Sequence, residues 1–303
     1  MQIGIDLGGT KIEGIAIEGA NELLRRRIRA PRGDYAATIR EVCALVGAIE
    51  VDLGRAGTVG VGIPGSISAR TGLVKNANST WLIGKPLDRD LERALGRPVR
   101  VTNDANCFAL SEATDGAAQD AHTVFGVIIG TGTGGGIVVG RQVLEGRNGI
   151  AGEWGHNPLP WPRDDERPGG ACYCGRTGCI ETFLSGPGLS ADHLAATGEQ
   201  LDPVAIVNRA SRGDPAARST LRRYEARMTR ALASIINVVD PDVIVLGGGL
   251  SNMRSLYERV PQLWAPFVFS DRVVTPLVQN VHGDSSGVRG AAWLWPDADP
   301  LPD

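Results

Sequence analysis

The 303-residue chain is long enough for two ordinary domains, each with a sizeable core. Its 42% hydrophobic and 21% charged residues are typical of a soluble globular protein, and a net charge of −3 argues against a nucleic-acid-binding surface. No apolar run approaches the roughly 20 residues that span a bilayer, and the first residues lack the pattern of a secretion signal. We therefore expect a cytoplasmic protein without a membrane or nucleic-acid partner, whose five cysteines are reduced thiols or metal ligands.

The first 120 residues show the pattern of an α/β domain. Apolar residues at 3–7 predict a buried strand, and the glycines at 8 and 9 predict a tight turn into a second strand at 11–17. The other elements expected in this part are a helix at 36–53, a buried strand at 58–65, and a strand within 98–106 that runs into a helix of about 14 residues.

The later part of the chain begins with the same pattern of strand, Gly/Thr turn and strand. Residues 122–132 and 135–140 mirror residues 4–17, and this weak repeat predicts two related α/β halves. We expect a domain of residues 1–120 and a second of residues 121–303. The next elements expected are a non-periodic loop at 153–185, helices within 202–238, and a strand, glycines and a helix start at 242–252. A closing helix is expected at 282–295, capped by Asp284 or Ser285, and it can pack back on the first domain. A loose tail is expected at 296–303.

Two glycine-rich hairpins are candidate phosphate-binding sites. In GIDLGGTK (4–11), backbone N–H groups can surround a phosphate, Asp6 can hold Mg²⁺ through water, and Lys11 can offset phosphate charge. In GTGTGGG (130–136), Thr131, Gly132 and Thr133 can form a second clamp. An ordinary tight hairpin is the alternative for the first stretch.

Other nucleotide motifs fit the chain less well. The spacing of Gly130, Gly132 and Gly135 matches a dinucleotide fingerprint, but a strand follows it rather than a helix. A Walker-type phosphate loop is absent from the sequence. Glycines 247–249 lie between a buried strand and a helix start, where they suit either close approach of adenosine or a tight turn.

Asp104 is the candidate general base. It lies in NDAN (103–106) at a predicted strand-to-helix junction, and transfer of a phosphoryl group to a hydroxyl needs a carboxylate that orients the hydroxyl and accepts its proton. A helix N-cap is the alternative role for Asp104. The flanking Asn103 and Asn106 offer both donors and acceptors, which suits the hydroxyls of a polyol.

A cysteine-rich loop has the ligand set of a closed zinc site. The ligands would be three thiolates and one imidazole, with spacing H-x15-C-x-C-x4-C, from His156, Cys172, Cys174 and Cys179. Such a set leaves no open position, so the zinc would be structural. It would hold His156 and the nearby Glu153 rigid. Glu153 and Glu181 can accept hydrogen bonds from sugar hydroxyls, with solvated surface residues as the alternative reading.

Together, DLGGTK, NDAN, GTGTGGG, ExGH and CxCGxxGCxE resemble the ROK family of sugar kinases, in the family's order and over residues 3–295. The resemblance implies a two-domain actin-like α/β fold of the hexokinase and heat-shock ATPase type, with a nucleotide cleft between duplicated halves. It implies ATP, Mg²⁺ and structural Zn²⁺ as cofactors and a homodimer as the assembly. By resemblance, Asp104 is the base, and His156, Cys172, Cys174 and Cys179 are the zinc ligands.

The resemblance also distributes the binding positions. The nucleotide positions fall on Gly4, Ile5, Asp6, Leu7, Gly8, Gly9, Thr10 and Lys11, on Thr133, Gly134, Gly135, Gly136, Ile137, Val138, Val139 and Gly140, and we add Gly248 and Gly249. The sugar contacts fall on Asn78, Asn103, Asp104, Glu153, His156 and Glu181.

Within the family, segments 62–68, 75–82, 152–161 and 282–296 are most similar to bacterial fructokinases, also called manno(fructo)kinases. This similarity implies that MgATP phosphorylates fructose to fructose 6-phosphate, with mannose or glucose as further hexose substrates. An N-acetylglucosamine kinase or a glucokinase of the same family is the alternative. A sugar-sensing regulator without catalysis is a distant alternative, since family regulators carry a helix-turn-helix domain ahead of the first motif and five residues precede Asp6 here.

Overall fold

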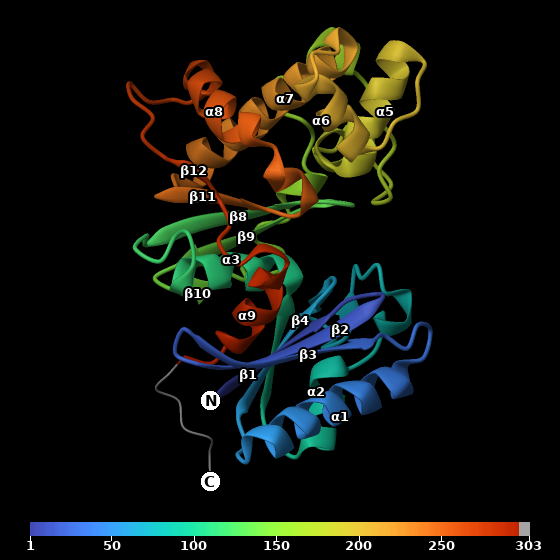
Figure 1. The fold of residues 1–303 in the computed structure, drawn as a ribbon, viewed down its shortest axis with the longest axis vertical. Helices are drawn as coiled ribbons and strands as arrows, with labels where there is room; N and C mark the ends of the chain where they lie inside the picture. Colours follow the sequence, from blue (N-terminus) through green and yellow to red (C-terminus); the bar gives the residue numbers. More distant parts are fainter. Residues whose placement is uncertain (297–303) are drawn as a thin grey trace. The chain divides into compact units, whose positions relative to one another are not determined.

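The computed structural model describes residues 1–296, apart from the side chain of Asp284 (Figure 1). The predicted tail lies outside the described residues, except for Pro296, and so does the Asp284 side chain as a helix cap. The chain forms two compact units. The first contains residues 1–120, 136–151 and the segment from 281 onward, and the second contains residues 121–135 and 152–280. The domain boundary expected near residue 120 stays a prediction.

The first unit is built on a five-stranded sheet of order β3-β2-β1-β4-β7. The strands are β1 (Gln2–Leu7), β2 (Lys11–Glu18), β3 (Asn21–Arg29), β4 (Thr58–Ile63) and β7 (Val99–Asn103). β2 runs antiparallel to β1 and β3, whereas β1, β4 and β7 are parallel. The short strands β5 (Ser66–Ile67) and β6 (Val74–Lys75) pair separately.

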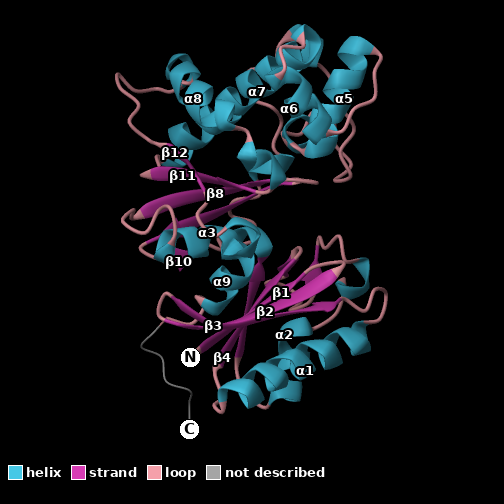
Figure 2. Cartoon of the chain, in the orientation of Figure 1, coloured by secondary structure: helices cyan, strands magenta, loops and turns pink. Residues whose placement is uncertain are grey.

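Helices cover both faces of this sheet, which explains why β1 and β4 are buried along nearly their whole length (Figure 2). α1 (Tyr35–Leu53) and α2 (Leu87–Leu95) lie on one face, and α9 (Ser286–Ala292) lies on the other. Glycines in two strands let α9 approach the sheet closely. A Cβ on Gly4 would lie 2.1 Å from the Val288 carbonyl oxygen, and one on Gly60 would lie 1.8 Å from that of Ala291.

α3 (Asp104–Asp115) follows β7 directly and packs on α9. At this helix crossing, a Cβ on Gly290 would lie 1.6 Å from the carbonyl oxygen of Cys107, so the two backbones are in contact. Because β1, β4 and β7 are parallel, their carboxyl ends meet at one edge of the sheet. The turn after Leu7, the turn at Gly65 and the start of α3 therefore lie at the same edge.

The second sheet has the order β10-β9-β8-β11-β12, the counterpart of the first sheet's order. Its strands are β8 (Thr123–Ile129), β9 (Thr133–Val139), β10 (Gln142–Val143), β11 (Val243–Gly247) and β12 (Leu277–Gln279). The matching order confirms the predicted duplication of α/β halves. Its helices are α4 (Glu181–Leu184), α5 (Gly186–Thr197), α6 (Pro203–Ser211), α7 (Pro215–Val239) and α8 (Arg254–Leu263).

Several predicted elements differ in extent. The helical region 202–238 is two helices, because Gly213 adopts φ +98° and the Asp214 side chain then caps α7. The closing helix is restricted to Ser286–Ala292 and Ser285 makes no capping bond; its hydroxyl accepts instead from Arg25. β3 was not predicted, because its arginine-rich sequence lies at a sheet edge and is mostly exposed.

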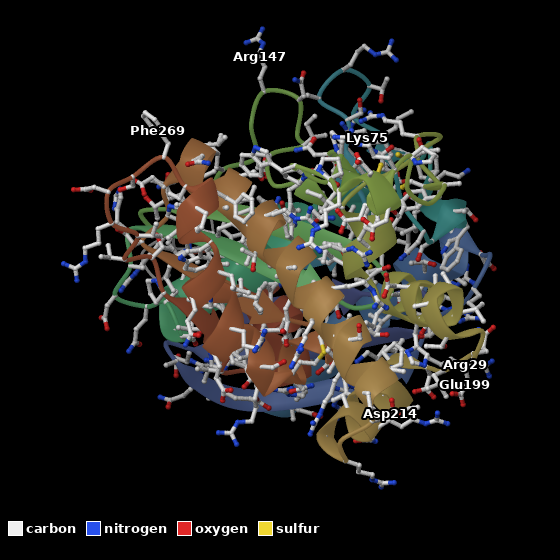
Figure 3. The ribbon with its side chains drawn as sticks, turned by 90° about the horizontal axis from the view of Figure 1, so that it is seen from above. Arg29, Lys75, Arg147, Glu199, Asp214 and Phe269 are labelled. Carbon is white, nitrogen blue, oxygen red and sulfur yellow. The ribbon has the colours of Figure 1, made fainter. Side chains whose placement is uncertain are left out.

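Charged side chains project from many elements of the surface, as Arg147, Glu199 and Asp214 show in Figure 3. Phe269, in the loop after α8, is fully exposed as well. Within the described part of the chain, no helix combines the length and apolar character needed to cross a membrane.

Candidate functional site

The first glycine hairpin joins β1 to β2 and is held from behind. The Gly8 N–H donates to the Lys11 carbonyl (3.0 Å), and Ala30 N–H donates to the Thr10 carbonyl (3.0 Å). Arg32 Nε donates to the Gly9 carbonyl at 3.0 Å. These bonds fix the turn through its carbonyl groups. The hairpin is therefore a rigid turn at the sheet edge defined above.

Asp6 lies at the end of β1 beside Glu13 of β2, its antiparallel partner. Burial and the neighbouring Glu13 carboxylate raise the pKa of Asp6 to about 6, although Lys11 and Arg27 partly offset the repulsion. Glu13 is fully buried and accepts from Arg27 Nε at 2.8 Å. Ionisation of the Asp6 carboxyl group is unfavourable, and a bound cation would stabilise the ionised form. Asp6 therefore fits an Mg²⁺ site.

Asp104 is the first residue of α3 and is exposed. Asn103 is the N-cap, and its Oδ1 accepts from Ala105 N–H at 2.9 Å. Asp104 Oδ1 accepts from the same N–H at 2.8 Å. The predicted alternative, a cap role for Asp104, thus belongs to its neighbour, because the residue before the first helical one has the extended backbone that a cap needs.

The asparagines near Asp104 differ in what they can reach. Asn103 Nδ2 also donates to the Gly65 carbonyl at 3.0 Å, which ties the start of α3 to the turn after β4. Asn106 is buried and its Nδ2 donates to Thr102, so its expected role toward polyol hydroxyls stays a prediction. Asn78 is exposed, and the adjacent buried Ser79 contacts the first hairpin. Asn78, Asn103 and Asp104 therefore all belong to segments at one edge of the first sheet.

The second hairpin contacts the cysteine-rich loop through Glu181. The Thr133 N–H donates to Glu181 Oε2 at 3.0 Å, and a Cβ on Gly132 would lie 2.6 Å from that oxygen. Trp154 Nε1 donates to the Gly134 carbonyl at 3.0 Å. Glu181 is therefore bonded to the hairpin, and its alternative reading as a solvated surface residue is wrong.

The glycines after β11 divide between the two predicted roles. Gly248 has φ +83°, and a Cβ there would lie 2.5 Å from the Ile129 carbonyl oxygen, so the turn itself requires glycine. Gly249 faces open space, because among the described residues, its two chain neighbours aside, no heavy atom lies within 4 Å of the position that a Cβ would take there. A ligand can approach the backbone at Gly249.

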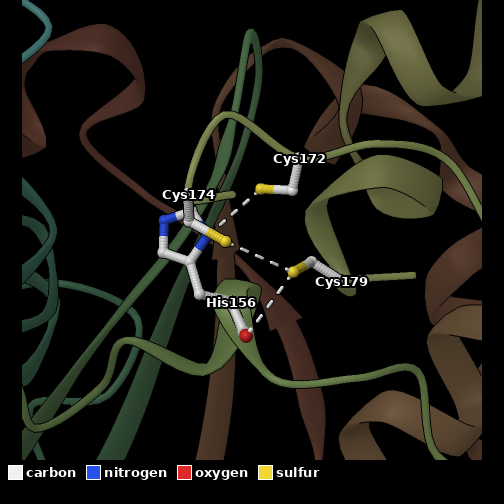
Figure 4. A group of neighbouring side chains, drawn as sticks. All are labelled: His156, Cys172, Cys174 and Cys179. Carbon is white, nitrogen blue, oxygen red and sulfur yellow. Dashed lines mark hydrogen bonds between the residues drawn. The ribbon is translucent and has the colours of Figure 1, made fainter. Parts of the chain in front are cut away.

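Four predicted metal ligands converge in the second unit (Figure 4). The ligand atoms of His156, Cys172, Cys174 and Cys179 all lie within 4.8 Å of one another. His156 Nδ1 is 3.5 Å from Cys172 Sγ, and Cys174 Sγ is 3.6 Å from Cys179 Sγ. Tetrahedral zinc with bonds of about 2.0 Å to nitrogen and 2.3 Å to sulfur has edges of about 3.5 and 3.8 Å. The two separations match these edges, and the four ligand atoms lie within 4.8 Å of one another, so the residue types and their convergence fit a zinc site.

A buried ion-pair network holds the middle of the same loop. Glu166 is buried and accepts from Arg227 Nε (2.9 Å) and Arg230 Nη2 (2.7 Å), both on α7. Burial alone would raise the pKa of Glu166, but the bonds from Arg230, the Arg163 backbone and Arg227 hold it at about 2. Sequence reasoning missed this network, because its members are about 60 residues apart and carry no shared motif.

Tyr173 is a second residue that sequence reasoning missed. It lies between two of the cysteines, and its hydroxyl is 2.9 Å from His156 Nε2. The available signal was its position between two predicted metal ligands, but the C-x-C spacing accepts any residue there.

Comparison with known proteins identifies the family and the fold. The model of the ROK family matches residues 2–298. The chain belongs to the ROK family. It is 42% identical to the N-acetyl-D-glucosamine kinase of Vibrio cholerae over 97% of this chain and 99% of that protein. The structure is similar to the ROK hexokinase from Thermus thermophilus (TM-score 0.86, 32% identity, 96% of each chain).

A third similar protein is a ROK glucokinase from Streptomyces griseus, solved in complex with glucose and AMPPNP (TM-score 0.76, 27% identity, 97% of this chain and 98% of that one). These likenesses extend from end to end of the chain. They confirm the predicted actin-like α/β fold of the family's sugar kinases.

The raised pKa of Asp6 gives a pH-dependent prediction. Above pH 6 the folded protein bears the cost of charging Asp6, whereas at pH 4 the folded carboxyl is protonated and the cost is absent. Without Mg²⁺ or nucleotide, Asp6→Asn should therefore be about 1–3 kcal/mol more stable than the parent chain at pH 7. That advantage should shrink as the pH falls through 6.

Urea unfolding at pH 7 and pH 4.5 measures both values, with the surface variant Asp271→Asn as the control. A destabilised Asp6→Asn at pH 7 would contradict the electrostatic account.

Proposed function

We propose that this chain phosphorylates N-acetyl-D-glucosamine on its primary hydroxyl. The chain is an ATP-dependent sugar kinase of the ROK family. The observation that carries the sugar assignment is the 42% identity with the Vibrio cholerae N-acetyl-D-glucosamine kinase over nearly the whole of both chains. The fructose expectation rests on short segments such as 75–82 and 152–161, so we place fructose second.

The base of the reaction is assigned to Asp104. A sugar hydroxyl is a poor nucleophile, and a carboxylate at hydrogen-bond distance orients it and takes its proton as the new P–O bond forms. The bond from Ala105 N–H fixes the Asp104 carboxylate at the first turn of α3. Exposure of Asp104 leaves it accessible to a substrate in the sugar-free protein.

The two hairpins and the glycines after β11 are assigned to MgATP, which supplies the phosphoryl group. Residues 4–11 and 133–140 would hold phosphates through backbone N–H groups other than those of Gly8 and Thr133, which are bonded within the protein. Asp6 would bind Mg²⁺, which relieves the repulsion from Glu13. Gly249, with open space beside it, suits an adenosine contact.

The sugar is assigned to residues of both units. In the first unit these are Asn78 and Asn103, beside the base. In the second they are Glu153, His156 and Glu181, on the loop that structural zinc would hold rigid through its three cysteines and His156. Glu181 is already bonded to the Thr133 N–H, so a sugar contact there would couple the sugar residue to the second hairpin. The homodimer stays a prediction.

A coupled ADP-release assay with N-acetylglucosamine, fructose, mannose and glucose, with and without Mg²⁺, tests the proposal. We expect the highest kcat/KM with N-acetylglucosamine and no turnover without Mg²⁺. A higher value for fructose would keep the kinase and overturn the sugar. No turnover with any sugar would overturn the kinase proposal itself.

Asp104→Asn keeps the size of the side chain but removes the base. We expect kcat to fall by about 10²–10⁴-fold, with the melting temperature and AMPPNP affinity unchanged. The assay above and thermal unfolding measure these quantities, and the exposed Asp52→Asn is the control. Near-normal turnover in Asp104→Asn would remove Asp104 from the mechanism.

Cys174→Ser removes one thiolate from the proposed zinc site. Zinc content and melting temperature should fall together, because metal binding contributes to folding stability. Metal analysis of the purified protein and thermal unfolding report both, and Cys43→Ser in α1 should retain full zinc. One zinc per chain in Cys174→Ser would contradict the ligand set.

A further inference from the structure

Tyr173 contacts His156 at the ring nitrogen that does not face Cys172. Its ring packs edge-on against the imidazole, with centroids 5.1 Å apart and planes at 88°. Its hydroxyl is 2.9 Å from His156 Nε2, while His156 Nδ1 faces Cys172 Sγ at 3.5 Å. Yet Tyr173 remains 79% exposed. An aromatic ring so exposed beside a fixed imidazole is available to a ligand.

The chemistry of the imidazole decides which nitrogen a sugar can use. Coordination through Nδ1 leaves the proton on Nε2, which is then a hydrogen-bond donor. With zinc bound at Nδ1, the Tyr173 oxygen would accept that N–H in the sugar-free protein. Any sugar hydroxyl that bonds to His156 must therefore meet the Tyr173 hydroxyl at the same nitrogen.

Two of the other proposed sugar contacts of the second unit are carboxylates. Glu181 and Glu153 both lie close enough to Tyr173 to interact with it electrostatically. Carboxylates accept hydrogen bonds and cannot donate them, whereas a phenol can do both. Tyr173 thus adds a second donor, beside the His156 Nε2–H, to a set whose other members are carboxylates, and its ring supplies an apolar face for the C–H groups of a sugar.

We propose that Tyr173 is a further sugar-binding residue of this kinase. In the sugar-free protein its oxygen accepts the His156 Nε2–H. When a sugar hydroxyl takes over that N–H, Tyr173 donates its own O–H to the sugar. This inference rests on the proposed function, because it takes the sugar to bind at Glu153, His156 and Glu181.

A different role would be to orient His156 for the metal alone, since ligating imidazoles usually bond a second group through the other nitrogen. The two roles give different results in Tyr173→Phe, which keeps the ring and removes the oxygen. A metal-orienting role predicts weaker zinc binding. A hydroxyl that the sugar simply displaces predicts an unchanged or lower KM for the sugar.

The test uses the zinc-loaded, full-length protein. We expect Tyr173→Phe to raise the KM for the preferred sugar by about 2- to 13-fold, the effect of losing one neutral hydrogen bond. The KM for ATP, kcat, zinc content and rate of zinc loss to a chelator should stay at parental values. Tyr35→Phe, which removes a hydroxyl bonded to Asp90 in the first unit, is the matched control and should change none of them.

A sugar KM that is unchanged or lower in Tyr173→Phe overturns the inference, and so does accelerated zinc loss without a change in KM. These outcomes are distinct from failure of the proposed function, in which the parental chain turns over no sugar. If fructose replaces N-acetylglucosamine as the preferred sugar, the same comparison is made with fructose.

Discussion

Contact between backbones, with no side chain in between, sets the geometry of the first unit. α9 lies directly on β1 and β4 because Gly4 and Gly60 carry no Cβ, and α3 lies directly on α9 because Gly290 carries none. Close-packed interiors transmit small displacements, so this arrangement ties the start of α3 to the end of β1. Asp104 and the first hairpin depend on it, since one begins α3 and the other follows β1.

In the second unit, side-chain interactions rather than backbone contacts hold the loop at 153–185 in place. A segment with little secondary structure cannot rely on strand or helix hydrogen bonds, and here two separate anchors replace them. The first anchor is Glu166, which is bonded to two arginines of α7. The second anchor is the cluster of His156, Cys172, Cys174 and Cys179. Removing one partner of a buried ion pair leaves an uncompensated charge, so substituting one residue of the first anchor would destabilise the protein. In the second unit, the side chains proposed to bind the sugar belong to these anchors or lie near them in the sequence.

Electrostatics distinguishes the two carboxylates of the first unit. Asp6 is partly buried beside Glu13 and is costly to charge, whereas Asp104 is exposed at the first turn of a helix, where negative charge is favoured. The same residue type thus suits a cation in one place and a proton acceptor in the other. The difference comes from burial and from the Glu13 carboxylate, which the pairing of β1 with β2 places beside Asp6.

The sequence by itself determined the family, the duplicated α/β pattern and the convergence of His156 with its three cysteines. These follow from local signals: apolar strands, glycine turns and ligand spacing are each contained in a short stretch of chain. Only the tertiary structure decided that Asn103 is the cap beside Asp104, that Glu181 bonds the second hairpin, and that Tyr173 lies against His156. Those roles depend on which side chain lies within hydrogen-bond distance of a given atom. Packing between segments, rather than residue type, sets that distance.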